Sequence, residues 1–255
     1  MLLSDRMLAV VGLVEPCERM ADIGCDHGYV AIELVRRRIC GHVIAMDINQ
    51  GPLRRAGDNI RQYGMQEAIE TRLSDGMEAL CEGEADGIIC AGMGGRLMIS
   101  ILESGRGLIG GMQQIILQPQ SEIREVRAYL RSSGFVTDRE DMVCEDGKYY
   151  PMMRVRTASA GQAVLKPLDE EETRLARVRD TYGPYLLESA HPVLKRYLLW
   201  EKENFENIRG NLACREQITT RQQCRIAELD EKLCDIAFCL EHYFSAETED
   251  IHEVL

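Results

Sequence analysis

The chain has 255 residues, 45% of them hydrophobic, and a formal net charge of −12. This length suits one domain of roughly 150 residues and a smaller second one, and the acidic total argues against a surface that is basic throughout. Apolar runs such as LAVVGLV are far shorter than the roughly 20 residues of a membrane helix. No membrane segment is therefore expected.

The amino terminus reads as the first helix. Its sequence, MLLSDRMLAVV, has an acid and a base at positions 5 and 6 and no small-residue cleavage site, which is not the pattern of a signal peptide. The ten cysteines include no Cys-x-x-Cys pair, so we expect free thiols in a reducing cytoplasm. Cys214, Cys224 and Cys234 are evenly spaced, but they lack a neighbouring Cys or His to complete a zinc site. No metal is expected.

Strand-like and helix-like segments alternate over the first 157 residues. Strands ending in turn residues are predicted at 19–24, 42–47, 68–74, 86–92 and 113–119. Helices are predicted at 28–38, 51–63, 94–104 and 121–132. Repeated strand–helix units predict an α/β fold, a parallel sheet with helices on both faces. Two longer strands around the turn at 145–148 predict a hairpin that closes one sheet edge.

A change of pattern marks a second domain. Small residues and a proline in ASAGQAVLKPLDEEE indicate a boundary, and we predict domains at 1–160 and 161–255. Beyond it, leucine and isoleucine recur at helical steps, which predicts helices at about 168–180, 191–211 and 213–240 in a helical hairpin or coiled coil. From 174 to 226, basic residues outnumber acidic ones. This segment is either a nucleic-acid-binding face or an ordinary solvated surface.

The turn after the first predicted strand suggests the kind of ligand. It holds Asp22, Gly24, Asp26, His27 and Gly28. Gly24 permits a sharp turn, and the helix that starts near Gly28 offers the positive end of its dipole. A dinucleotide-binding loop uses glycines so that a pyrophosphate can approach backbone amides, and Asp26 would repel one. The turn suits a cationic ligand such as S-adenosylmethionine, which carries a sulfonium and an ammonium.

Three further turns follow the next strands, at the edge where an open α/β sheet binds ligands. Asp47 ends the second strand, where a carboxylate can bind both ribose hydroxyls. Asp75 follows the third strand and can accept a hydrogen bond from the adenine amino group. The glycine-rich AGMGG at 91–95 follows the fourth. The candidate cofactor residues of these turns are Asp47, Ile48, Ser74, Asp75, Gly76, Ala91, Gly92, Met93 and Gly94.

Four segments carry a resemblance to a known family: ADIGCDHGYVAIELV, AGMGG, ILQPQ and EDGKYYPMMRV. They resemble the bacterial tRNA (adenine(22)-N1)-methyltransferases, as does YGPYLLE with HPVLKRYL in the helical part. The resemblance implies a class I methyltransferase fold with a Rossmann-like sheet, S-adenosylmethionine as cofactor, tRNA as partner and a helical domain that helps hold the tRNA. Cys25 and Gln120 depart from the family pattern, where a small hydroxyl residue and an asparagine are usual.

The turn at 91–95 agrees with methylation of a ring nitrogen. It lacks the prolines and aromatic residue that enzymes acting on exocyclic amines carry there. Ring N1 of adenine has a free lone pair and no proton, so its methylation depends mainly on alignment with the methyl group. A glycine-rich wall would let the base come close to the sulfonium. We predict three catalytic residues: Asp26 would stabilise the developing cation, and Gln118 and Pro119 would hold the edge of the base. Arg36, Arg37 and Arg38 would contact phosphates.

Other classes of function stay open at this point. A small-molecule methyltransferase would not need the helical domain, and an RNA-binding or assembly module could keep the cofactor pocket without catalysis. A nicotinamide enzyme is disfavoured by Asp26. We expect a monomer.

Overall fold

A computed structural model describes residues 3–157, 170–214 and 219–245. The chain divides into two compact units, Met1–Pro167 and Leu168–Leu255. The boundary predicted between residues 160 and 161 lies outside the described residues. In the described part of the chain, no helix combines the length and apolar character needed to cross a bilayer.

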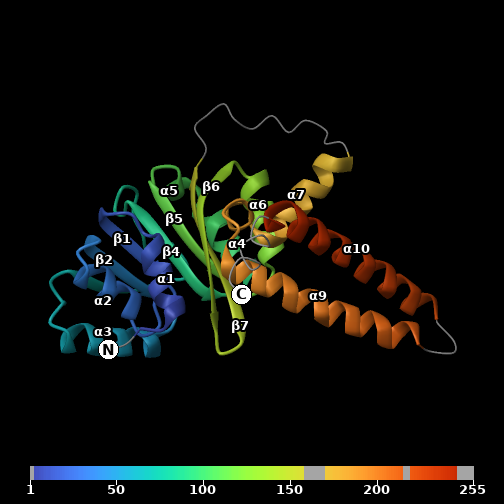
Figure 1. Cartoon of the computed structure of the whole chain (residues 1–255). Helices are drawn as coiled ribbons and strands as arrows, with labels where there is room; N and C mark the ends of the chain where they lie inside the picture. The colour runs from blue at the N-terminus through green and yellow to red at the C-terminus, as the bar shows by residue number, and fades with distance from the viewer. Residues whose placement is uncertain (1–2, 158–169, 215–218, 246–255) are drawn as a thin grey trace, which may run out of the picture. The chain divides into compact units, whose positions relative to one another are not determined.

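The first unit contains a seven-stranded sheet of order β3-β2-β1-β4-β5-β7-β6 (Figure 1). Its strands are β1 (Cys17–Ile23), β2 (Cys40–Asp47), β3 (Ile69–Leu73), β4 (Gly87–Met93), β5 (Gln114–Pro119), β6 (Phe135–Glu145) and β7 (Lys148–Thr157). The first five strands pair in parallel, β7 is antiparallel to β5, and β6 forms the edge. The predicted parallel sheet with a closing hairpin is confirmed.

Helices cover both faces of this sheet. They are α1 (Asp5–Leu13), α2 (Tyr29–Arg36), α3 (Gln50–Gln62), α4 (Gly95–Ser104), α5 (Arg106–Ile109) and α6 (Ile123–Ser132). Strand side chains alternate between two apolar layers: Ile115 and Leu117 of β5 pack with α4 and α6, and Ile116 packs with α1, α2 and α3. Because the side chains of the central strands β4 and β5 are buried on both faces, these strands are fixed in register.

The second unit is helical, with α7 (Glu170–Tyr182), α8 (Pro184–Glu188), α9 (Pro192–Ala213) and α10 (Thr220–Tyr243). α9 and α10 form a long helical hairpin (Figure 1). The predicted helix start at 213 is wrong, since α9 continues to Ala213 and α10 begins at Thr220. The reason is a capping box: the Thr219 hydroxyl accepts from the Gln222 amide, and the Gln222 side chain accepts from the Thr219 amide. The short helix α8 was not predicted.

All ten cysteines lie in the described part of the chain and are free thiols. Cys17 and Cys40 face each other across β1 and β2 with their Sγ atoms 3.4 Å apart. Among the described residues, no cluster of three or more His, Cys, Asp or Glu side chains is arranged to hold a metal ion.

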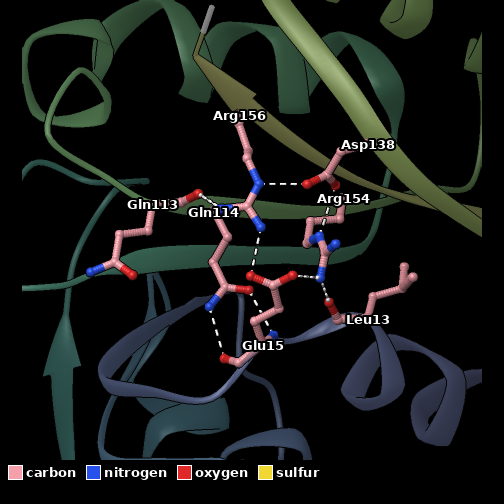
Figure 2. Close-up of polar contacts among 7 residues, drawn as sticks. All are labelled: Leu13, Glu15, Gln113, Gln114, Asp138, Arg154 and Arg156. Atoms are coloured by element: carbon pink, nitrogen blue, oxygen red, sulfur yellow. Dashed lines mark hydrogen bonds and ion pairs between the residues drawn. The ribbon is translucent and has the colours of Figure 1, made fainter.

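An ion-pair network ties the end of α1 to the strands at the amino end of β5 (Figure 2). Arg154 pairs with Glu15 at 2.8 Å and with Asp138 at 2.7 Å, and it donates to the Leu13 carbonyl. Arg156 bonds both carboxylates as well. The Gln114 side chain accepts from the Glu15 amide and donates to the Glu15 carbonyl, each at 2.9 Å. The network therefore joins segments that are about 140 residues apart in the sequence.

This network makes stability depend on pH. Burial alone would raise the pKa of Asp138, but the hydrogen bonds from Arg154 and Arg156 outweigh it and hold that pKa below its ordinary value. The Arg156 hydrogen bond likewise lowers the pKa of Glu15. A carboxyl group whose pKa is depressed in the folded state stabilises the protein above its unfolded-state pKa, near 4, and this stability is lost as the pH falls.

We predict that Asp138→Asn lowers the free energy of unfolding at pH 7 by about 1–3 kcal/mol, because it removes charged hydrogen bonds from a nearly buried arginine. At pH 3 the stability difference between the variant and the wild type should be smaller than at pH 7. Urea unfolding at both pH values measures the difference. Asp58→Asn, which removes an exposed pair with Arg61, is the control and should cost no more than about 1 kcal/mol. An equal loss at pH 3 and pH 7 would contradict the prediction.

Candidate functional site

The turn between β1 and α2 is built around glycines that carry positive φ. Gly24 has φ +75° and Gly28 has φ +70°. A Cβ on Gly24 would lie 3.2 Å from Met93 Cε, and one on Gly28 would lie 3.1 Å from Ala56 Cβ. Both positions therefore need glycine for the backbone conformation and for close approach. The same distance places the turn after β1 against Met93, the last residue of β4.

Asp22 is the buried carboxylate of this edge. It lies on β1 between β2 and β4, is 3% exposed, and its Oδ2 atom has no hydrogen-bond partner in the described structure. Burial, and after it the nearby Asp47 carboxylate, raises the pKa of Asp22 to about 7. A buried unpaired carboxylate is costly unless a cation or a donor meets it. Asp22 therefore points to a ligand with a positive group.

Asp26 has different surroundings from those that the sequence suggested. Its backbone has φ +44°, and its side chain is exposed. Arg55 bonds one carboxylate oxygen at 3.2 Å, and His27 Nε2 lies 3.5 Å from the other. The His27 ring stacks on Tyr29, with 5.7 Å between the ring centroids. The negative charge of Asp26 is thus shared with a neighbouring cation, whereas that of Asp22 is not.

The turns after β2 and β3 lie side by side at the same edge. The Ser74 amide donates to the Asp47 carbonyl, and one oxygen of the Asp47 carboxylate accepts from the Asn49 amide at 2.8 Å. The Ser74 hydroxyl donates to the Gly76 carbonyl and accepts from an amide of the same turn, so Ser74 builds the turn itself. Asp75 is exposed.

Ile48 offers an apolar surface beside these turns. Its side chain is 58% exposed directly after Asp47. An exposed isoleucine next to a carboxylate provides an apolar face and a polar group within one turn. That combination suits a nucleoside.

The two ends of the AGMGG segment have different physical roles. Gly92, near the end of β4, has φ +78° and is exposed, and a Cβ there would meet Arg6 Nη1 at 3.5 Å. A Cβ on Gly95 would lie 2.5 Å from the Ser121 carbonyl oxygen, so Gly95 is required by packing. Gly94 caps the start of α4. Ala91 and Met93 are partly buried beside them.

Gln118 and Pro119 end β5 in buried positions. Gln118 is fully buried, and its side-chain oxygen accepts from the Gly92 amide at 3.1 Å and from Arg6 Nη1 at 3.0 Å. Its amide nitrogen donates to the Pro119 carbonyl. Gln118 thus holds the glycine turn in place. Whether it also contacts a base stays a prediction.

Sequence reasoning missed several residues at this edge. Arg6 reaches Gln118 from α1, and its guanidinium carbon lies 5.1 Å from the centre of the Tyr150 ring. Arg55 of α3 pairs with Asp26. Long-range contacts of this kind leave no local pattern, although Tyr150 does fall within a segment of the family resemblance. The predicted phosphate-binding residues Arg36 and Arg37 both bond Glu33 at 2.6–2.7 Å.

Comparison with known proteins shows which proteins the chain is similar to. The methyltransferase-domain family matches residues 3–153. The tRNA (adenine(22)-N(1))-methyltransferase of Bacillus subtilis (strain 168) is 29% identical over 91% of this chain and 94% of its own. A solved structure of the B. subtilis enzyme has a TM-score of 0.77 at 27% identity and covers 94% of this chain and 99% of its own. A structure from Streptococcus pneumoniae, named "a putative tRNA (m1A22) methyltransferase, in complex with S-adenosyl-L-methionine", has a TM-score of 0.77 at 29% identity, covering 94% and 100%.

The unpaired carboxylate leads to a stability prediction. Between pH 4 and 7 the folded state holds a proton on Asp22 that the unfolded state has lost, so the wild type loses stability as the pH rises through this range. Asp22→Asn should therefore be more stable than the wild type at pH 8, by up to about 4 kcal/mol. The difference in unfolding free energy between Asp22→Asn and the wild type should be smaller at pH 5.

Chemical unfolding at pH 5 and pH 8 tests this prediction. Glu67→Gln, at an exposed position, serves as the control and should leave both curves unchanged. If the unfolding free energies of the wild type and Asp22→Asn change equally between pH 5 and pH 8, Asp22 is not a buried, unpaired carboxylate.

Proposed function

The chain belongs to the methyltransferase-domain family, and on that premise we propose that it transfers a methyl group from S-adenosylmethionine to N1 of adenine 22 in tRNA. The observation that carries the proposal is the buried Asp22 carboxylate with an unpaired oxygen, beside a turn that needs glycine at Gly24 and Gly28. The likeness to the B. subtilis enzyme, which extends over both units of the chain, supports the tRNA substrate.

The residues at the sheet edge fit this cofactor. A cationic ligand satisfies Asp22, whereas the pyrophosphate of a dinucleotide would add an anion next to two carboxylates. Asp47 would bind the ribose hydroxyls, Ile48 would cover the adenine, and Asp75 would accept from its amino group. The turn Gly24–Gly28 would surround the methionine part. The cofactor supplies an activated methyl group when bound.

The protein then has to place the base. Because N1 of adenine carries a lone pair and no proton, no general base is needed, and catalysis rests on orientation. Gly92 is exposed and carries no side chain, so a flat base could approach the chain there. Gln118 fixes the Gly92 amide, so it would act by positioning this turn. Asp26 remains the predicted group that stabilises the cationic product, with Arg55 moderating its charge.

The helical unit would bind the tRNA. Arg196 of α9 and Arg221 of α10 are exposed, and neither has an ion-pair partner among the described residues. A small-molecule methyltransferase would have no use for these cations. An RNA-binding module without catalysis is also a weaker alternative, because the carboxylates and glycines of the cofactor half are all present. A monomeric, cytoplasmic protein stays our expectation.

Methyl transfer from labelled S-adenosylmethionine to an unmodified tRNA transcript tests the reaction. We expect a reverse-transcription stop at adenine 22, lost in a transcript with guanine at that position. Asp22→Asn should weaken cofactor binding by at least tenfold, because it removes the charge opposite the cationic group. Glu67→Gln is again the control. Tight cofactor binding without labelled tRNA would overturn the proposed substrate.

Charge reversal tests the helical unit. The double variant Arg196→Glu, Arg221→Glu should weaken tRNA binding at least tenfold and leave cofactor affinity unchanged, because it replaces two attractive phosphate contacts by repulsion. Fluorescence titrations with tRNA and calorimetry with the cofactor measure the two affinities. Glu203→Gln on the exposed face of α9 is the control. Unchanged tRNA affinity in the double variant would remove this surface from the proposal.

A further inference from the structure

Arg6 occupies an unusual position for a residue near the amino terminus. It is the second residue of α1, yet its Nη1 atom lies 3.0 Å from the side-chain oxygen of Gln118, at the carboxyl end of β5. The Tyr150 ring lies under the guanidinium, and the Arg6 amide donates to Glu145. Three elements (α1, β5 and the β6–β7 hairpin) therefore hold this side chain at the edge of the sheet that carries the candidate site.

The charge of Arg6 is poorly neutralised. The nearest oxygen of Glu145 is 3.9 Å from its Nε atom, and this buried Nε has no hydrogen-bond partner in the described structure. Other arginines in the same unit are paired closely: Arg127 meets Glu140 at 2.9 Å, and Arg154 meets Asp138 at 2.7 Å. Because its ion pair with Glu145 is long, at 3.9 Å, the Arg6 guanidinium can still attract an anion.

The glycine turn leaves Arg6 partly exposed, with 20% of its side chain open to solvent. A Cβ placed on Gly92 would lie 3.5 Å from Arg6 Nη1. A side chain at this position would therefore stand in front of the guanidinium, and the glycine keeps the approach open. The Gly92 amide and Arg6 Nη1 share the same acceptor on Gln118, so the turn and the cation are fixed together.

The sheet edge is thus divided by charge. Asp22 and Asp47 lie on the side of β1 and β2 and suit a cationic cofactor. Arg6 lies on the side of β4 and β5, next to the turn where the proposed function places the base. Methylation of N1 makes the base cationic, so a guanidinium at the reacting edge of the base would oppose the reaction. A backbone phosphate is the acceptor that the charge of Arg6 favours.

We propose that Arg6 is a positioning residue that binds a backbone phosphate of the target nucleotide, with Tyr150 and Gln118 holding the guanidinium in place. The proposal rests on the proposed function for the identity of the polynucleotide as tRNA. It assigns Arg6 to the substrate and not to the cofactor.

The salt dependence of tRNA binding tests the proposal. The slope of log Kd against log salt concentration counts the phosphate contacts, and loss of one contact reduces it by about one unit. Arg6→Gln should weaken tRNA binding by about tenfold or more and reduce the slope, while cofactor affinity stays unchanged. Arg6→Lys, which keeps the charge, should keep the slope. Tyr150→Leu should also weaken tRNA binding, because it removes the ring under the guanidinium. Tyr150→Phe keeps the ring and should bind tRNA as the wild type does.

Arg154→Gln is the matched control, because Arg154 is also an arginine that ties α1 to the sheet, but at the opposite end of β5. It should lower thermal stability without changing the slope. If Arg6→Gln gives the same pattern as Arg154→Gln, Arg6 is purely structural and the proposal is overturned. Weaker binding with an unchanged slope would also overturn the phosphate assignment. A third outcome separates the two proposals. If the salt slope falls in Arg6→Gln but the wild-type protein transfers no methyl group to tRNA, the proposed reaction is overturned and the phosphate contact of Arg6 is supported.

Discussion

A carboxylate buried in the middle of a parallel sheet, with one oxygen left unpaired, is the constraint around which this site is organised. Asp22 is costly to the folded protein, and an apolar residue would pack at the same position of β1 without that cost. The surrounding structure has to hold it rigidly: the Gly24 and Cys25 amides bind the Met46 carbonyl, and the glycines with positive φ complete the turn. Stability is given up at the position where, under the proposed function, a ligand cation would restore it.

The opposite ends of the same strands show the reverse arrangement. At the amino end of β5, arginines and carboxylates are fully paired, and Gln114 joins the chain after α1 to the strand. At the carboxyl end, Asp22 and Arg6 both keep unsatisfied polar atoms. The paired charges at the amino end hold the sheet together. The unpaired groups of both signs at the carboxyl end suit a cationic cofactor and a polyanionic substrate.

The sequence predicted those features that local patterns control. Short strand-like runs that precede turn residues located β1 to β5, and the EDGK turn located the hairpin. The Thr219–Gln222 capping box is also a local signal, but helical periodicity runs across it and misplaced the start of α10. Spacing alone could not show that Asp22 is buried while Asp26 pairs with Arg55, because the first depends on the neighbouring strands β2 and β4 and the second on α3. Arg6 and Gln118 are 112 residues apart, and no periodicity links them.

Helix α1 connects the two ends of the sheet. Its first turn carries Arg6, and the Leu13 carbonyl at its last residue is held by Arg154. A residue inserted within α1 would rotate everything beyond it by about 100° and lengthen the helix by about 1.5 Å. Arg6 and Leu13 could then no longer both face their partners. The length of this helix is consequently far less tolerant of change than its exposed side chains, and natural variants should show substitutions between these two anchors but no insertions or deletions.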